Sequence, residues 1–142
     1  MSQQNVEIVR RAYESFNRWA ARPKEDPLAN PEVESLFHPE VAFHTYPNAP
    51  EAGVYRGRDA VIAYNQRLFE QFESLRIDVE EVVDAGDRVV VVSTQHAIPK
   101  GGGRQEIHVH MAEVWTVRDG LLAERHSYST KGEALEAEGL RE

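Results

Sequence analysis

One carboxylate stands out in the C-terminal half of the chain because it interrupts an apolar stripe. Between Ile107 and Val117 every odd-numbered residue is large and apolar, with the single exception of Glu113. Since a strand alternates faces with period two, one face of this strand should carry Glu113 among apolar neighbours. Removing an unpaired carboxylate from water costs several kcal/mol, so Glu113 needs a partner or a wet cavity. The pattern therefore predicts a pocket at Glu113, suited to proton transfer or to binding an oxygen atom.

Two residues on the following strand could face Glu113, and the turn between the strands decides which. A three-residue turn ending at Gly120 sets Glu113 opposite Arg125 and keeps Leu121 on the apolar side. A two-residue turn ending at Gly120 sets Glu113 opposite His126 instead. We favour Arg125. Glu113 would then be the acid/base or oxygen-binding group with Arg125 as its tuning partner, or the two would form a purely structural ion pair.

A second polar group for the site is expected at the end of an earlier strand. The strand expected at residues 41–46 carries His44 and Tyr46 on the opposite parity from Phe43. A bulge, or the Pro47 that follows, could turn either side chain toward the mouth of the pocket. His44 and Tyr46 are therefore candidate catalytic residues beside Glu113.

Two histidines, His108 and His110, share one face of the strand that carries Glu113. A His-x-His pair on a strand can bind a metal, and the stretch resembles the first motif of the cupins. The spacing differs from that motif, however, and places Glu113 on the other face from both histidines. We therefore expect no metal site and place both histidines on the outer face of the sheet, with a cupin-like site as the alternative. His96, near a strand end, is expected at the rim or surface.

Composition narrows the class of protein. The chain has 142 residues, a net charge of −8 and no cysteine, which predicts one domain and excludes disulfides and thiolate chemistry. An acidic chain with scattered basic residues argues against binding nucleic acid or anionic membranes. Without an apolar leader or a spanning run, we expect a cytoplasmic protein. With no phosphate-binding loop either, we expect no cofactor.

The periodicity changes along the chain from helical to strand-like. Helices are expected at residues 4–21, 30–37, 59–73 and 132–139, and strands at 41–46, 75–83, 88–96, 107–117 and 121–128. Helices before an antiparallel sheet indicate an α+β fold. Besides the polar candidates, the residues expected to line the substrate pocket are Tyr13, Phe16, Trp19, Tyr64, Met111, Trp115 and Ser127.

Five segments in this order resemble the NTF2-like superfamily, and more narrowly its SnoaL-like branch, which includes polyketide cyclases and proteins similar to ketosteroid isomerases. The segments are Asn5–Asn17, Tyr55–Val61, Asp84–Val91, Val114–Leu121 and Glu133–Leu140. The resemblance implies that residues 1–142 form one SnoaL-like domain. It also implies an NTF2-like cone, in which N-terminal helices pack on a strongly curved antiparallel or mixed sheet that encloses one pocket.

The resemblance also suggests roles for individual positions. In the isomerases a Tyr on the first helix and an Asp on a late strand form an oxyanion hole; these positions match Ala12, with Tyr13 beside it, and Glu113. Acidic positions of the epoxide hydrolases and cyclases fall near Ser93 and Ser127, so none of these catalytic sets is complete.

Two functions are therefore carried forward. The first is a cofactor-independent enzyme that transfers protons on a small hydrophobic carbonyl or hydroxyl compound, by isomerisation, cyclisation or dehydration. The second is a non-catalytic ligand-binding or dimerisation module of the same fold. A homodimer is expected because the even-numbered face of residues 107–117 is too apolar for a free surface.

Overall fold

A computed structural model describes residues 2–21, 35–45, 52–101, 103 and 105–140 of the chain. Its helices are α1 (Ser2–Ala21), α3 (Arg58–Glu70) and α4 (Lys131–Glu138). Its strands are β1 (Phe37–His44), β2 (Val54–Arg56), β3 (Phe72–Ala85), β4 (Arg88–Pro99), β5 (Ile107–Arg118) and β6 (Leu121–Tyr128).

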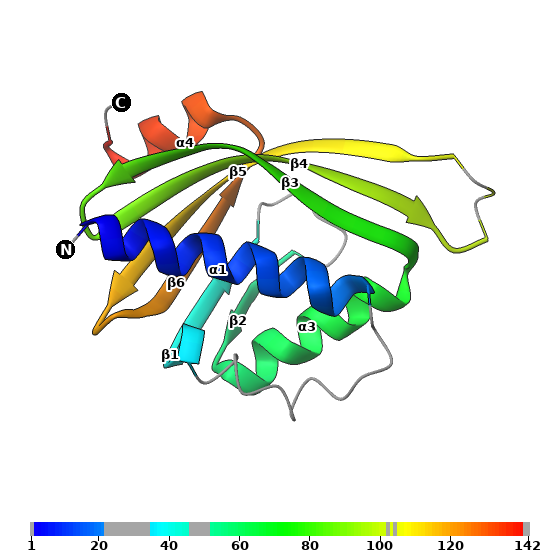
Figure 1. The fold of residues 1–142 in the computed structure, drawn as a ribbon, viewed down its shortest axis with the longest axis horizontal. Helices are drawn as coiled ribbons and strands as arrows, with labels where there is room; N and C mark the ends of the chain where they lie inside the picture. Colours follow the sequence, from blue (N-terminus) through cyan, green and yellow to red (C-terminus); the bar gives the residue numbers. More distant parts are fainter. Residues whose placement is uncertain (1, 22–34, 46–51, 102, 104, 141–142) are drawn as a thin grey trace.

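The strands form one sheet in the order β2-β1-β6-β5-β4-β3. Neighbouring strands are antiparallel except for β1 and β6, which run parallel. Helices α1 and α3 lie on one side of the curved sheet, and α4 packs on the other (Figure 1). The predicted α+β NTF2-like cone with a mixed sheet is therefore confirmed.

The inner face of the sheet holds the main core, because the apolar stripe of α1 packs against alternate residues of the central strands. Val9 and Tyr13 of α1 meet Val89, Val91 and Trp115 of β4 and β5. Each of these residues is less than one tenth exposed. This packing fixes α1 across the sheet and brings its Tyr13 over β5.

Several predicted boundaries were wrong. Strand β1 begins at Phe37 and includes Pro39, where we expected a helix to end, because a register shift between Phe37 and Ala42 accommodates the proline. Strand β3 begins at Phe72, so α3 is shorter than expected, and β2 was not predicted. The rest of the short helix expected at residues 30–37 lies mostly outside the described residues.

The outer face of β5 changes the basis of the dimer prediction. Ala112 and Val114 are fully buried there, and the cluster that covers them includes Ala134 and Leu135 of α4. The apolar part of this face is therefore covered by the same chain, so its apolar character no longer calls for a second copy. The homodimer stays a prediction without that argument.

Candidate functional site

The turn between β5 and β6 contains two residues, not the three we favoured. Asp119 and Gly120 both have positive φ, 56° and 74°, which is the pattern of a type I′ turn. Arg118 accordingly pairs with Leu121. A register shift then follows, because β6 has one extra residue there, and the pairs beyond it are displaced by one residue.

This shift sets the partner of Glu113. Beyond it Trp115 pairs with Arg125 and Glu113 pairs with Ser127, so neither predicted residue lies directly opposite Glu113. The extra residue of the bulge turns Arg125 and Ser127 to the same face as Glu113, where His126 would otherwise have pointed. Arg125 reaches Glu113 diagonally, one pleat along the strand.

The carboxylate of Glu113 is buried, with the residue only 2 % exposed. Its Oε1 accepts a 2.6 Å hydrogen bond from the hydroxyl of Tyr13, which in turn accepts one of 2.9 Å from the indole N–H of Trp115. Its Oε2 accepts a 3.0 Å hydrogen bond from the hydroxyl of Ser127. Both oxygens therefore have hydrogen-bond donors from the protein, which offsets part of the cost of burying the charge.

Arg125 supplies the opposite charge. Its Nε lies 3.2 Å from Oε2 of Glu113, and both side chains are largely withdrawn from solvent. The guanidinium carbon lies 3.9 Å from the centroid of the Phe43 ring, so the cation also rests on an aromatic face. Phe43 was expected in the core, and its position beneath Arg125 was not predicted.

Tyr13 is held in its protonated form by this environment. Burial raises the pKa of Tyr13 well above its usual range, and the charge of Glu113 and the hydrogen bond to it raise the pKa further. The hydroxyl therefore remains a hydrogen-bond donor across the physiological pH range. Burial likewise raises the pKa of Tyr64, with Arg125 acting in the opposite direction.

A cavity with two lobes opens beside this group. In each lobe about 50 Å³ is open to the centre of a water molecule; the surrounding empty space, about 540 and 420 Å³, includes open solvent at the mouths. Glu113 and Arg125 border both lobes, as do Phe16, Asn65 and Ile77. The other wall residues are mainly apolar and aromatic, so the ion pair is the charged part of an otherwise hydrophobic cavity.

The structure brings most of the predicted site residues to this cavity. All seven residues expected as walls line one lobe or the other: Tyr13, Phe16, Trp19, Tyr64, Met111, Trp115 and Ser127. The predicted pair Glu113 and Arg125 lies among them. The contact between Tyr13 and Glu113 was not predicted, and the resemblance had matched the isomerase tyrosine to Ala12, one residue earlier.

His44 lies elsewhere. It borders neither lobe, and its Nε2 contacts the Glu124 carboxylate at 3.1 Å on the outer side of the sheet. The alternation of β1 accounts for this, since buried Phe43 points inward and its neighbour outward. Tyr46 lies outside the described residues. The structure thus assembles Glu113 and Arg125 without His44.

Trp19 in the cavity wall carries a buried hydrogen-bond donor. The indole Nε1 of Trp19 is buried and has no hydrogen-bond partner among the described residues. Trp19 lines the same lobe as Glu113 and Arg125. A buried N–H without an acceptor is costly, so an oxygen atom of a bound molecule would be stabilised there. Asn65 and Gln95 add polar atoms to the walls and were also missed from the sequence.

A sequence comparison decides the family. The profile of the SnoaL-like domain matches residues 9–125, which contain the ion pair and every cavity-lining residue except Ser127. The chain belongs to the SnoaL-like family. No curated protein sequence matches this SnoaL-like chain closely enough to count as a relative.

Solved structures agree with the fold of this SnoaL-like protein. A protein from Jannaschia sp. CCS1, named as a candidate SnoaL-like polyketide cyclase, is 27% identical with a TM-score of 0.72, over 95% of this chain and 90% of that one. An NTF2-like protein of unknown function from Burkholderia pseudomallei K96243 is 21% identical with a TM-score of 0.73, over 94% and 95%. TerC, co-crystallised with polyporic acid, is 20% identical with a TM-score of 0.71, over 94% and 96%.

No helix within the described part of the chain is both long enough and apolar enough to cross a membrane.

Proposed function

We propose that this SnoaL-like protein binds a small hydrophobic molecule bearing a carbonyl or hydroxyl group and transfers protons on it without a cofactor. The reaction would be an isomerisation, a cyclisation or a dehydration. The observation that carries this proposal is the buried Glu113–Arg125 pair, which borders both lobes of an otherwise apolar cavity. Ionisable groups in such a cavity are typical of binding and catalytic sites.

Each residue of the group has a role in this proposal. Glu113 accepts or returns the proton, because it is the carboxylate at the cavity wall. Arg125 stabilises negative charge, and Tyr13 orients the carboxylate through its 2.6 Å hydrogen bond. The indole N–H of Trp19, which has no acceptor within the described part of the chain, is the candidate donor to an oxygen atom of the ligand. TerC, which was co-crystallised with polyporic acid, lends support only through its similar fold.

The alternative is a non-catalytic binding module. It is favoured by one observation: Glu113 already contacts Tyr13, Ser127 and Arg125, all from its own chain. A carboxylate with three such partners can have a purely structural role, which is to hold the floor of the cavity together. Under this alternative ligands bind, but no proton moves.

A proton-exchange experiment separates the two. Small ketones, epoxides and aromatic acids are first screened by thermal shift, and ketones that bind are then incubated in D2O and followed by NMR. We expect the protein to speed exchange of protons next to the carbonyl, and Glu113→Gln to lower that rate by about 100-fold or more. Glu124→Gln, on the outer face, is the matched control and should exchange at the parent rate. Binding without exchange would establish the non-catalytic module instead.

A further inference from the structure

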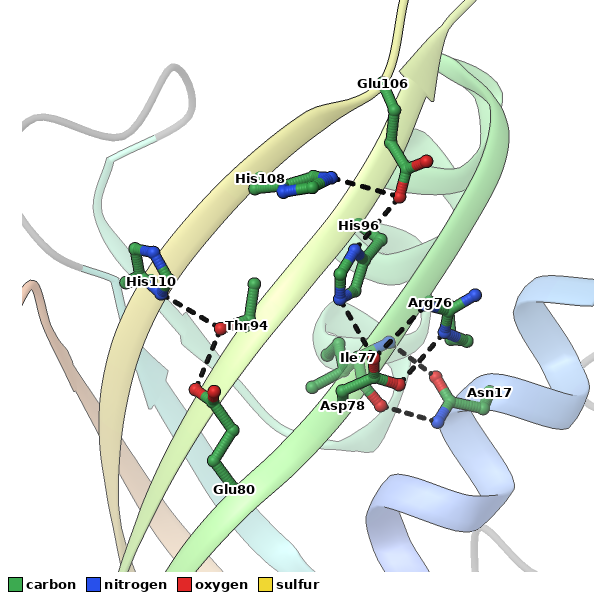
Figure 2. Close-up of polar contacts among 10 residues, drawn as sticks. All are labelled: Asn17, Arg76, Ile77, Asp78, Glu80, Thr94, His96, Glu106, His108 and His110. Carbon is green, nitrogen blue, oxygen red and sulfur yellow. Dashed lines mark hydrogen bonds and ion pairs between the residues drawn. The ribbon is translucent and has the colours of Figure 1, made fainter.

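The outer face of β4 and β5 carries a histidine–carboxylate cluster on the opposite side of the sheet from the cavity. His96 and His108 pair directly across the two strands, and their ring centroids lie 4.7 Å apart. Glu106 reaches both rings from just before β5 (Figure 2). The pairing we considered from sequence, His108 with His110, is not the one that forms: His110 instead contacts Thr94 at 2.9 Å.

Two ring nitrogens converge on a single oxygen atom in this cluster. His96 Nδ1 lies 2.9 Å and His108 Nε2 lies 3.3 Å from Oε1 of Glu106. Metal–ligand bonds of about 2.1 Å place neighbouring ligand atoms about 3.0 Å apart at right angles and about 3.4 Å apart in a tetrahedron. Both nitrogen–oxygen distances therefore match the spacing of a metal's ligand atoms, and the two ring nitrogens lie within 4.8 Å of each other.

The other nitrogen of His96 is fixed by a second carboxylate. His96 Nε2 lies 2.9 Å from Oδ2 of Asp78, and Arg76 holds Asp78 through two hydrogen bonds of 2.9 and 3.2 Å (Figure 2). With the proton on Nε2, the lone pair of Nδ1 points at Glu106, and a metal ion between the two atoms would be bound by both. A carboxylate behind a ligating histidine is the usual support of protein metal sites.

We propose that His96, His108 and Glu106 bind a divalent first-row transition-metal ion, with zinc as the reference ion. Two imidazoles and one carboxylate suit zinc, copper or nickel and leave positions open for water. Bound there, the ion would tie β4 to the start of β5. The site lies on the opposite face from Glu113, so it is independent of the proposed proton transfer.

A second group, His44, Glu124 and His126, is spaced less well. Its ring nitrogens lie 3.1 and 3.7 Å from one oxygen of Glu124, and the second of these distances is wider than a shared ion requires. The carboxylate behind His126 belongs to Glu138, which also accepts a hydrogen bond from Tyr128 and so fastens α4 to the sheet. A structural role accounts for that group, and it serves as a control.

Zinc titration of the untagged full chain by calorimetry tests the proposal. We expect saturable binding to which His96 and His108 each contribute, so that His96→Gln or His108→Gln weakens it by about 100-fold or more. Asp78→Asn, which only removes the support of His96, should weaken it by roughly 10-fold. Cobalt absorption bands in the parent, absent from His108→Gln, would report the same ligands by spectroscopy.

Two matched variants make the test decisive. His110→Gln removes a histidine from the same face of the same strand, and His126→Gln removes one from the second group; both should bind zinc like the parent. No zinc binding by the parent, or binding lost in His110→Gln or His126→Gln but kept in His108→Gln, would overturn the proposal. The cluster would then be an ion-pair network only.

Discussion

The two faces of the sheet hold carboxylates in opposite ways. On the inner face Glu113 is 2 % exposed and is partnered by hydroxyls and one arginine. On the outer face Glu106 and Glu124 are more than two fifths exposed at their side chains and face histidines. Desolvation makes each inner contact energetically important, whereas water screens the outer contacts. Carboxylates are therefore buried and partnered by hydroxyls and an arginine on the inner face, and exposed beside histidines on the outer face.

The largest expected effect is the loss of the inner charge pair. Glu113→Gln leaves Arg125 without its counter-charge and should lower the free energy of unfolding by about 3 kcal/mol. Glu113→Gln combined with Arg125→Met should recover much of that loss, because no charge then stays buried. Urea unfolding measures both. On the outer face, Glu124→Gln should cost less than about 1 kcal/mol; equal costs on the two faces would refute the comparison.

The same deletion of a tyrosine hydroxyl on each face sharpens the contrast. Tyr13→Phe removes the donor to buried Glu113 and the acceptor for Trp115, and should cost about 2 kcal/mol. Tyr128→Phe removes the donor to the partly buried Glu138 on the outer side and should cost about half as much or less. Urea unfolding of the two variants side by side gives the ratio. A larger loss for Tyr128→Phe would contradict the account.

Alkaline pH should act in part through Tyr13, beside Tyr64 and Tyr128, whose pKa values burial also raises. Burial and the nearby Glu113 raise the pKa of Tyr13 in the folded state, so below about pH 10 its phenol is protonated in both states and contributes no pH dependence. Above that pH the unfolded chain ionises first and binds fewer protons, so the free energy of unfolding falls as pH rises. We expect Tyr13→Phe to show a shallower decline between pH 10 and 11. Parallel declines would mean that Tyr13 titrates normally.

The smallest effect is expected at His44. Because it contacts Glu124 on the outer side and borders no cavity lobe, His44→Gln should change stability by less than about 0.5 kcal/mol. Ligands found by thermal shift should bind this variant as they bind the parent. Weaker ligand binding by the His44→Gln variant would show that His44 belongs to the binding site and would contradict this prediction.

The local patterns of the sequence were sufficient to predict most of the elements, although not β2, and the residues expected in the pocket walls. The spacing of Val9, Tyr13 and Phe16 predicted the inner stripe of α1, and the alternation along β5 singled out Glu113. These patterns repeat within one element, so they can be read without knowledge of the pairing.

What could not be predicted depends on register. The bulge on β6 has no distinctive local sequence, yet it decides that Ser127 lies opposite Glu113 and that Arg125 shares its face. The Tyr13–Glu113 contact joins residues 100 positions apart. The pairing of His96 with His108 likewise follows only from the register of β4 and β5.

We expect the Glu113–Arg125 pair to make the inner cavity a binding site for oxygen-bearing molecules. Thermal shift of the parent and of the Glu113→Gln/Arg125→Met variant, with the same panel of ketones, epoxides and aromatic acids, tests it most directly. A ligand at about 100 times its Kd should raise the parent's Tm by roughly 8 °C and leave the variant's Tm unchanged. Equal shifts in the two proteins, or no shift of the parent with any compound, would contradict the claim.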